Sequence, residues 1–151
     1  SILMGASPFF LDVLVNTLLK EKRPFIELFR IHTRKITLPK ILGLRLRGTD
    51  MVVLSACETG LGEVKSGEGV YGLRRAFIQA GAKSLVMSMW SVPDRETKEL
   101  MVEFYKNVLS GKMNRCQALR QASQKQMQVA RERYGHTNPF YWGAFVFLGE
   151  P

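Results

Sequence analysis

Cysteine and histidine are scarce in this sequence, with only two of each among its 151 residues. Cys57 and Cys116 lie far apart in the chain, and neither belongs to a Cys-x-x-Cys motif or to a cluster of cysteines and histidines. This scarcity excludes a disulfide-stabilised scaffold and a zinc-binding module, because both need several such residues at short spacings. The sequence therefore predicts no bound metal and no cofactor. It favours a reducing compartment such as the cytoplasm.

Long uninterrupted apolar runs are also missing. The most apolar early stretch, residues 2–19, contains Pro8, Asp12 and Asn16. A membrane span needs about 20 apolar residues with few or no charges. The stretch therefore predicts a buried amphipathic helix and argues against a membrane protein.

Acidic residues are fewer than basic ones, 13 against 22, so the formal net charge is +9. The basic residues are spread through helical patterns, and residues 51–94 are neutral as a group. Proteins that bind single-stranded nucleic acid interleave basic residues with aromatic stacking platforms, and this chain lacks that pattern. The charge alone therefore does not predict a nucleic-acid-binding protein.

The hydrophobic pattern predicts alternating strands and helices, which is typical of an α/β protein with a mostly parallel sheet. Two apolar runs, 51–56 and 83–90, suit strands covered on both faces, and the helix between them makes the strands parallel. The chain that follows each strand then leaves the sheet at the same edge, where α/β proteins bind ligands. The other expected elements are helices at 9–22, 38–42, 67–80, 96–109 (capped by Asp94 and stopped by Gly111) and 113–134, and a third strand at 140–148.

The last of these helices has an apolar stripe at helical spacing, on which we expect Cys116 to be a core residue. The stripe consists of Met113, Cys116, Leu119, Ala122, Met127 and Ala130.

Cys57 stands at the predicted carboxyl end of the first central strand, and the residues alone leave three interpretations open. It can be a packing residue, since buried cysteine is common. It can neighbour a phosphate-binding loop, since Gly67, Gly69 and Gly72 match G-x-G-x-x-G, although the match lies well beyond the strand end. It can be a nucleophile, because a strand end holds a thiol rigidly at a ligand-binding crevice.

A longer match favours the third interpretation. The segment "LRGTDMVVLSACETGLGEVKSGEGVYGLRRAFIQAGAKSLVMSMWSVPD" closely resembles the CHAT-domain family of caspase-like cysteine peptidases. "RETKELMVEFYKNVLSGK" and "NPFYWGAFVFLGEP" resemble the family's downstream segments, so the likeness runs from about Ile36 to Pro151. The resemblance implies a caspase-like three-layer α/β/α sandwich with a mostly parallel sheet. It implies that Cys57 is the nucleophile of a cysteine endopeptidase that acts on proteins or peptides. It also implies a substrate-binding segment, comprising Ser88, Met89, Trp90, Ser91 and Val92.

The family's general base is a histidine in a His-Gly pair, and no such pair occurs in this sequence. "SILMGA" resembles the segment just after that pair, so the base is expected before Ser1 and residues 7–35 are expected to be an insertion. His32 is a displaced candidate for the base, whereas we interpret His136 as structural. The chain would then be one partial domain, residues 1–151, that corresponds to the C-terminal half of the family's domain and is inactive alone.

Two functions from different classes remain open at this stage. One is the cysteine endopeptidase, and the other is a pseudopeptidase or protein-interaction module with the same fold. Expected partners are a peptide substrate and helical-repeat (TPR-like) sensor domains. A sheet that lacks its first strands would also expose one edge, which favours self-association.

Overall fold

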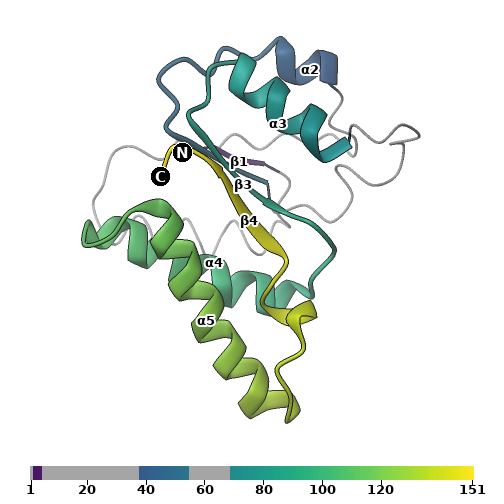
Figure 1. Cartoon of the computed structure of the whole chain (residues 1–151), viewed down its shortest axis with the longest axis vertical. Coiled ribbons are helices and arrows are strands. Elements are labelled where there is room, and N and C mark those ends of the chain that lie inside the picture. The colour runs from purple at the N-terminus through teal and green to yellow at the C-terminus, as the bar shows by residue number, and fades with distance from the viewer. Residues whose placement is uncertain (1, 5–37, 55–68) are drawn as a thin grey trace.

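The computed structural model describes residues 2–4, 38–54 and 69–151 (Figure 1). These ranges contain four strands, four α-helices and one short 3-10 helix. In chain order the elements are β1 (Ile2–Met4), α2 (Leu38–Leu42), β2 (Met51–Leu54), α3 (Gly69–Gln79), β3 (Ser84–Ser88), α4 (Asp94–Ser110), α5 (Arg115–Tyr134), η1 (Pro139–Tyr141) and β4 (Phe145–Gly149).

The four strands form one mixed sheet in the order β1-β2-β3-β4. β1 is parallel to β2, and β2 is parallel to β3, whereas β4 is antiparallel to β3. Parallel neighbours cannot be joined by a tight turn, and α3 lies in the connection between β2 and β3. The prediction of an α/β fold is therefore confirmed.

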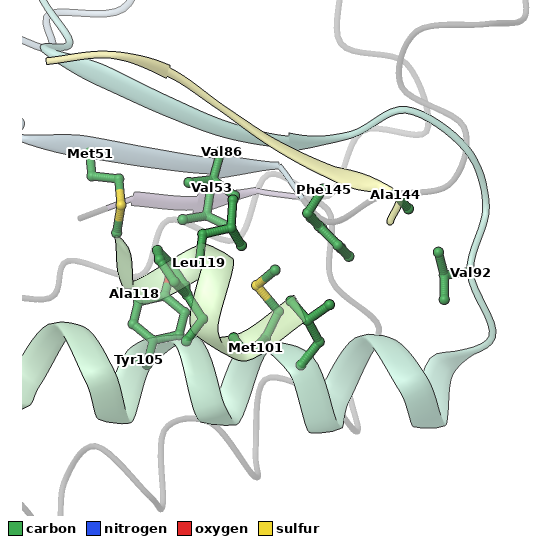
Figure 2. Close-up of a cluster of buried hydrophobic side chains, with 13 residues drawn as sticks. Met51, Val53, Val86, Val92, Met101, Tyr105, Ala118, Leu119, Ala144 and Phe145 are labelled. Atoms are coloured by element: carbon green, nitrogen blue, oxygen red, sulfur yellow. The ribbon is translucent and has the colours of Figure 1, made fainter. Parts of the chain in front are cut away.

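Helices cover the sheet on both faces, with α2 and α3 on one side and α4 and α5 on the other (Figure 1). Side chains alternate between the faces of a strand. Met51 and Val53 of β2 therefore join Val86 of β3 in a core against α4 and α5 (Figure 2). Val52 and Leu54 belong to the second core, against α2 and α3. This double covering is why the β2 run contains no polar residue.

The prediction that Asp94 caps α4 is wrong. Pro93 is the N-cap, with φ −54° and ψ 144°, and no side chain bonds at this cap. The proline ring fixes φ, and the chain enters the helix directly after it. Asp94 is therefore the first helical residue, where its negative charge interacts favourably with the positive end of the helix dipole. The predicted stop is confirmed, since Gly111 ends the helix with φ 67°.

α5 begins at Arg115, later than the pattern predicted. Asn114 is the N-cap: its Oδ1 accepts the Gln117 backbone N–H at 2.8 Å, and Gln117 Oε1 accepts the Asn114 N–H at 3.1 Å. This reciprocal capping box satisfies two backbone donors and sets the start of the helix.

Cys116 is exposed, so its assignment to the core is wrong. The residue lies in the first turn of α5, on the margin of the buried stripe, where solvent reaches it. The residues of α5 that are buried are Ala118, Leu119, Ala122, Gln126 and Ala130.

The C-terminal segment forms two elements where the pattern predicted one strand. Asn138 Oδ1 accepts the Phe140 N–H at 3.0 Å, and Pro139 opens the 3-10 helix η1. The Gly143 N–H then bonds to the Pro139 carbonyl oxygen at 2.7 Å, which closes the turn. The strand itself starts only at Phe145.

β1 pairs with the edge of β2, in a register that places Ile2 opposite Val52. Self-association through an exposed edge of the sheet remains a prediction. Several other predictions fall outside the described residues: the helix at 9–22, the insertion at 7–35, His32, residues 55 and 56 of the first central strand, and Cys57.

Candidate functional site

The carboxyl ends of β2 and β3 leave the sheet at the same edge, because the two strands are parallel neighbours. Leu54, the last residue of β2, lies opposite Met87. The predicted substrate segment, Ser88–Val92, starts at the next residue of β3. Cys57 follows Leu54 closely in the sequence and lies outside the described residues. The strand that leads to Cys57 is thus the direct neighbour of the strand that leads to Ser88–Val92.

One flank of the predicted substrate segment is already bonded to the chain itself. Ser88 pairs with Phe145 of β4, and the Met89 N–H donates to the Ala144 carbonyl oxygen at 2.8 Å. β4 and the residue before it, Ala144, therefore occupy the side of Ser88 and Met89 that faces away from β2.

The rest of the segment is anchored by its side chains and by α4. The Trp90 indole N–H donates to the Phe140 carbonyl oxygen at 3.1 Å, which ties the segment to η1. Val92 is 5% exposed and packs in the core against α4 and α5 (Figure 2). Ser91, between these two anchors, is exposed. The segment is thus held at Trp90 and Val92 and presents Ser91 to solvent.

A polar network that the sequence interpretation missed holds the turn after this segment. Glu96 in the first turn of α4 is 1% exposed, and its Oε1 accepts from Arg133 Nη1 at 2.7 Å and from the Tyr134 hydroxyl at 2.6 Å. Arg133 Nη2 also donates to Glu99 Oε1 at 2.8 Å. The Thr97 hydroxyl donates to the Val92 carbonyl oxygen at 3.4 Å. The last turn of α5 is therefore fastened to the first turns of α4, next to Val92.

The charges of this network stabilise one another. Burial raises the pKa of Glu99, but hydrogen bonds from Arg133 and Gln126 outweigh it and hold that pKa below its usual value. Hydrogen bonds to Glu99 and Glu96 raise the pKa of Arg133. The sequence contained a signal for this network: Glu96 and Glu99 lie three residues apart in α4, and Arg133 is a basic residue in the last turn of α5.

His136 lies in a stack of rings beyond the end of α5. Its ring is 6.0 Å from the ring centre of Tyr134 and 5.9 Å from that of Tyr141, and these two tyrosines stack at 4.4 Å. His136 Nδ1 accepts the Asn138 backbone N–H at 3.4 Å. These contacts are those of a residue that shapes a turn, which agrees with the structural interpretation of His136.

Residues 2–4, 38–54 and 69–151 include no group of three or more side chains that could hold a metal ion. In the same part of the chain, every helix is too short or too polar to cross a bilayer.

Comparison with known proteins places the chain in a family. The sequence profile of the CHAT domain matches residues 15–150. Tetratricopeptide repeat protein 28 of Mus musculus is 31% identical over 114 residues, which are 76% of this chain and 4% of that protein. Tetratricopeptide repeat protein 28 of Homo sapiens has the same identity and coverage, so the chain spans 4% of the length of these curated relatives. Because the profile covers most of the sequence, this chain belongs to the CHAT-domain family, a caspase-like, peptidase-related family.

Proposed function

We propose that this chain is the nucleophile-bearing part of a caspase-like cysteine endopeptidase domain. In this proposal Cys57 is the nucleophile, and Ser88–Val92 binds the substrate peptide. Residues 1–151 would form one partial caspase-like domain, a three-layer α/β/α sandwich with an insertion at 7–35. Membership of the CHAT-domain family supports the proposal.

The parallel pairing of Leu54 with Met87 is the observation that carries it. Strands of a sheet lie about 5 Å apart, so a nucleophile just after β2 and a peptide bound along the residues after β3 would share one crevice. β4 already occupies the far flank of Ser88 and Met89. An extended substrate would therefore bond to this segment on the flank that faces the residues following β2.

Peptide hydrolysis at this site requires a nucleophile, stabilisation of the oxyanion and a base that transfers a proton to the leaving amine. The Cys57 thiolate attacks the carbonyl carbon of the scissile peptide bond, and the Cys57 backbone N–H would stabilise the oxyanion that forms. A protonated base then gives its proton to the leaving amine as the peptide bond breaks. The acyl group remains on Cys57 as a thioester, which water then hydrolyses. We expect this base to be a histidine outside the chain, with His32 as the alternative. No metal or cofactor takes part.

A non-catalytic interaction module is the second candidate. The sequence has no His-Gly pair, and both curated relatives are named tetratricopeptide repeat proteins. A CHAT domain attached to helical repeats of this kind could recognise a protein without cleaving it. Either function suits a cytoplasmic protein with reduced thiols.

Peptide cleavage and covalent labelling separate the two functions. The 151-residue chain and a version extended at its N-terminus by a segment that carries the family's His-Gly pair are incubated with a peptide library and with an acyloxymethyl ketone probe. We expect the extended protein to cleave and the short chain to be slower by about 10²–10⁴-fold, because it lacks a matched base.

Three variants assign the roles. Cys57→Ala should abolish cleavage and labelling, whereas Cys116→Ser should leave both unchanged. Cleavage by the short chain that is lost in His32→Ala would move the base to His32. An extended protein that neither cleaves peptides nor reacts with the probe would establish the interaction module instead.

A further inference from the structure

The α2–α3 layer carries basic side chains and no acidic ones. Residues 38–49 and 69–82, which form this layer, contain no Asp or Glu. On the opposite layer, by contrast, Glu96, Glu99 and Glu103 of α4 are all paired with basic side chains. The arginines of the α2–α3 layer are Arg45, Arg47, Arg74 and Arg75, and all four are exposed.

Arg45 and Arg47 project on the same side of an irregular segment that crosses the end of α3. Leu46 between them is 4% exposed and belongs to the core, and its N–H donates to the Ala80 carbonyl oxygen at 2.8 Å. The backbone of Arg47 lies so close to Gly81 that a Cβ there would come within 2.7 Å of the Arg47 nitrogen. Both arginines therefore lie beside the carboxyl-terminal end of α3.

The outward face of α3 continues this basic surface. Phe77 is fully buried, whereas Arg74, Arg75 and Ile78 are exposed. Residues three and four apart are neighbours on a helix surface, so Ile78 lies between the two arginines one turn away.

Apolar side chains are exposed among these arginines. Leu42 of α2, which packs against α3, is 52% exposed, and Ile78 is 40% exposed. Together with Tyr134 at the end of α5 and Phe140 in η1, they are the large apolar side chains that are most exposed among those the structure describes. We call the surface formed by Leu42, Arg45, Arg47, Arg74, Arg75 and Ile78 the arginine face.

We propose that the arginine face binds an acidic, amphipathic segment of a protein partner. Carboxylates of the partner would pair with the four guanidinium groups, and its apolar side chains would cover Leu42 and Ile78. Arginine is enriched in protein interfaces, and it pairs with carboxylates through two parallel hydrogen bonds. The face lies across the sheet from α4 and α5, and its binding does not depend on peptidase activity at Cys57 (Figure 1).

The apolar residues favour a protein over nucleic acid. Leu42 and Ile78 are exposed and offer nothing to a phosphate backbone, whereas apolar side chains of a protein partner would cover them.

Fluorescence anisotropy with a labelled peptide tests the proposal. The probe is a helical peptide of about 18 residues with glutamates along one face and leucines along the other. Its scrambled isomer has the same composition and no apolar face. A single-stranded oligonucleotide of equal charge and vesicles of phosphatidylserine are the other two probes.

The double variant Arg74→Glu/Arg75→Glu should weaken binding of the amphipathic peptide by about tenfold or more. The milder Arg74→Gln/Arg75→Gln should weaken it less, and the double variant Leu42→Asn/Ile78→Asn should remove the preference for the amphipathic over the scrambled peptide. Lys106→Glu/Arg120→Glu makes the same charge change at exposed positions of α4 and α5 and should change affinity by less than about twofold.

Circular dichroism of each variant checks that the fold is retained. The proposal would be overturned if the amphipathic peptide did not bind, or if it bound no more tightly than its scrambled isomer. It would also be overturned if the control variant lost as much affinity as Arg74→Glu/Arg75→Glu, or if the oligonucleotide or the vesicles bound more tightly than the peptide.

Discussion

The Tyr105 hydroxyl is buried between α4 and the sheet (Figure 2), and among the described residues it has no hydrogen-bond partner. Burial raises the pKa of this hydroxyl. A buried polar group without a partner loses its hydration and gains nothing in return, at a cost of about 1–3 kcal/mol.

We therefore expect Tyr105→Phe to leave the free energy of unfolding unchanged or to raise it by about 1 kcal/mol. Tyr134→Phe is the control, because that hydroxyl donates to buried Glu96 at 2.6 Å and its loss should destabilise the protein. Urea denaturation measures both. A clear loss of stability in Tyr105→Phe would mean that its hydroxyl has a partner.

The Glu96–Arg133 ion pair is the buried charge pair beside the candidate site. Glu96 has 2% of its side chain exposed and Arg133 has 21%. Removing one partner of such a pair leaves a buried charge unpaired, so Arg133→Met should lower the free energy of unfolding by about 3 kcal/mol. Lys125→Met breaks a pair with Glu103 in which the lysine is 58% exposed, and it should cost less than about 1 kcal/mol. Equal losses in urea denaturation would contradict this ranking.

The stabilising effect of Arg133 should depend on pH. Arg133 holds the pKa of Glu99 below its ordinary value of 4.5, so this contribution is complete well above pH 4.5. It is lost as the pH falls through the lower pKa of the folded state. The difference in unfolding free energy between the native protein and Arg133→Met should therefore be constant near neutral pH and shrink below about pH 4. A difference in unfolding free energy that grows as the pH falls would contradict the prediction.

At the scale of the element, α5 shows how a helical stripe can mislead at its end. Cys116 has the right spacing to join the stripe, yet it lies exposed in the first turn. We expect a thiol alkylator to label Cys116 rapidly in the folded protein, and Cys116→Ser to change the unfolding free energy by less than about 0.5 kcal/mol. Ala122→Leu is the contrast, because it overfills the α4–α5 contact and should cost about 1–3 kcal/mol. Slow labelling of Cys116 would show that its thiol is buried, as the helical pattern predicted.

The end of α3 depends on a glycine. Gly81 has φ +110°, and a Cβ there would lie 2.7 Å from the backbone nitrogen of Arg47. Gly81→Ala should therefore combine backbone strain with a clash against fixed backbone, at a cost of about 2 kcal/mol or more. Gly111→Ala is the matched control, since φ is +67° and nothing lies within 4 Å, so only strain of about 1 kcal/mol is expected. Similar midpoints for the two variants in urea would show that the contact with Arg47 relaxes.

At the scale of the whole molecule, β2 and β3 contribute to both cores. Phe77 in the α2–α3 core and Phe104 in the α4–α5 core are fully buried. Each Phe→Ala change should cost about 3–5 kcal/mol. Because the cores share the same strands, we expect each variant to lower one common transition. Tryptophan fluorescence reports on the α4–α5 side, where Trp90 packs, and circular dichroism reports on the entire chain. Two separate transitions would mean that the layers unfold independently.

Much of the fold could be predicted from the sequence because it depends on local patterns. Unbroken apolar runs indicated β2 and β3, glycine indicated the end of α4, and the intervening helix required the two strands to be parallel. The same order of elements predicted that Ser88–Val92 leaves the sheet at the end where β2 also terminates. The long family resemblance around Cys57 was confirmed as membership of the CHAT-domain family.

Only the tertiary structure decided what depends on partners distant in the sequence. The local sequence around Glu96 is that of a solvent-exposed helical residue. Its burial is possible only because Arg133 and Tyr134 reach it from the far end of α5. The exposure of Cys116 depends on how α5 rests against its neighbours, which no periodicity specifies. The four arginines of the arginine face come from two segments that are separate in the sequence. They share one surface because Leu46 and Phe77 are drawn into the same core, and that association has no local signal.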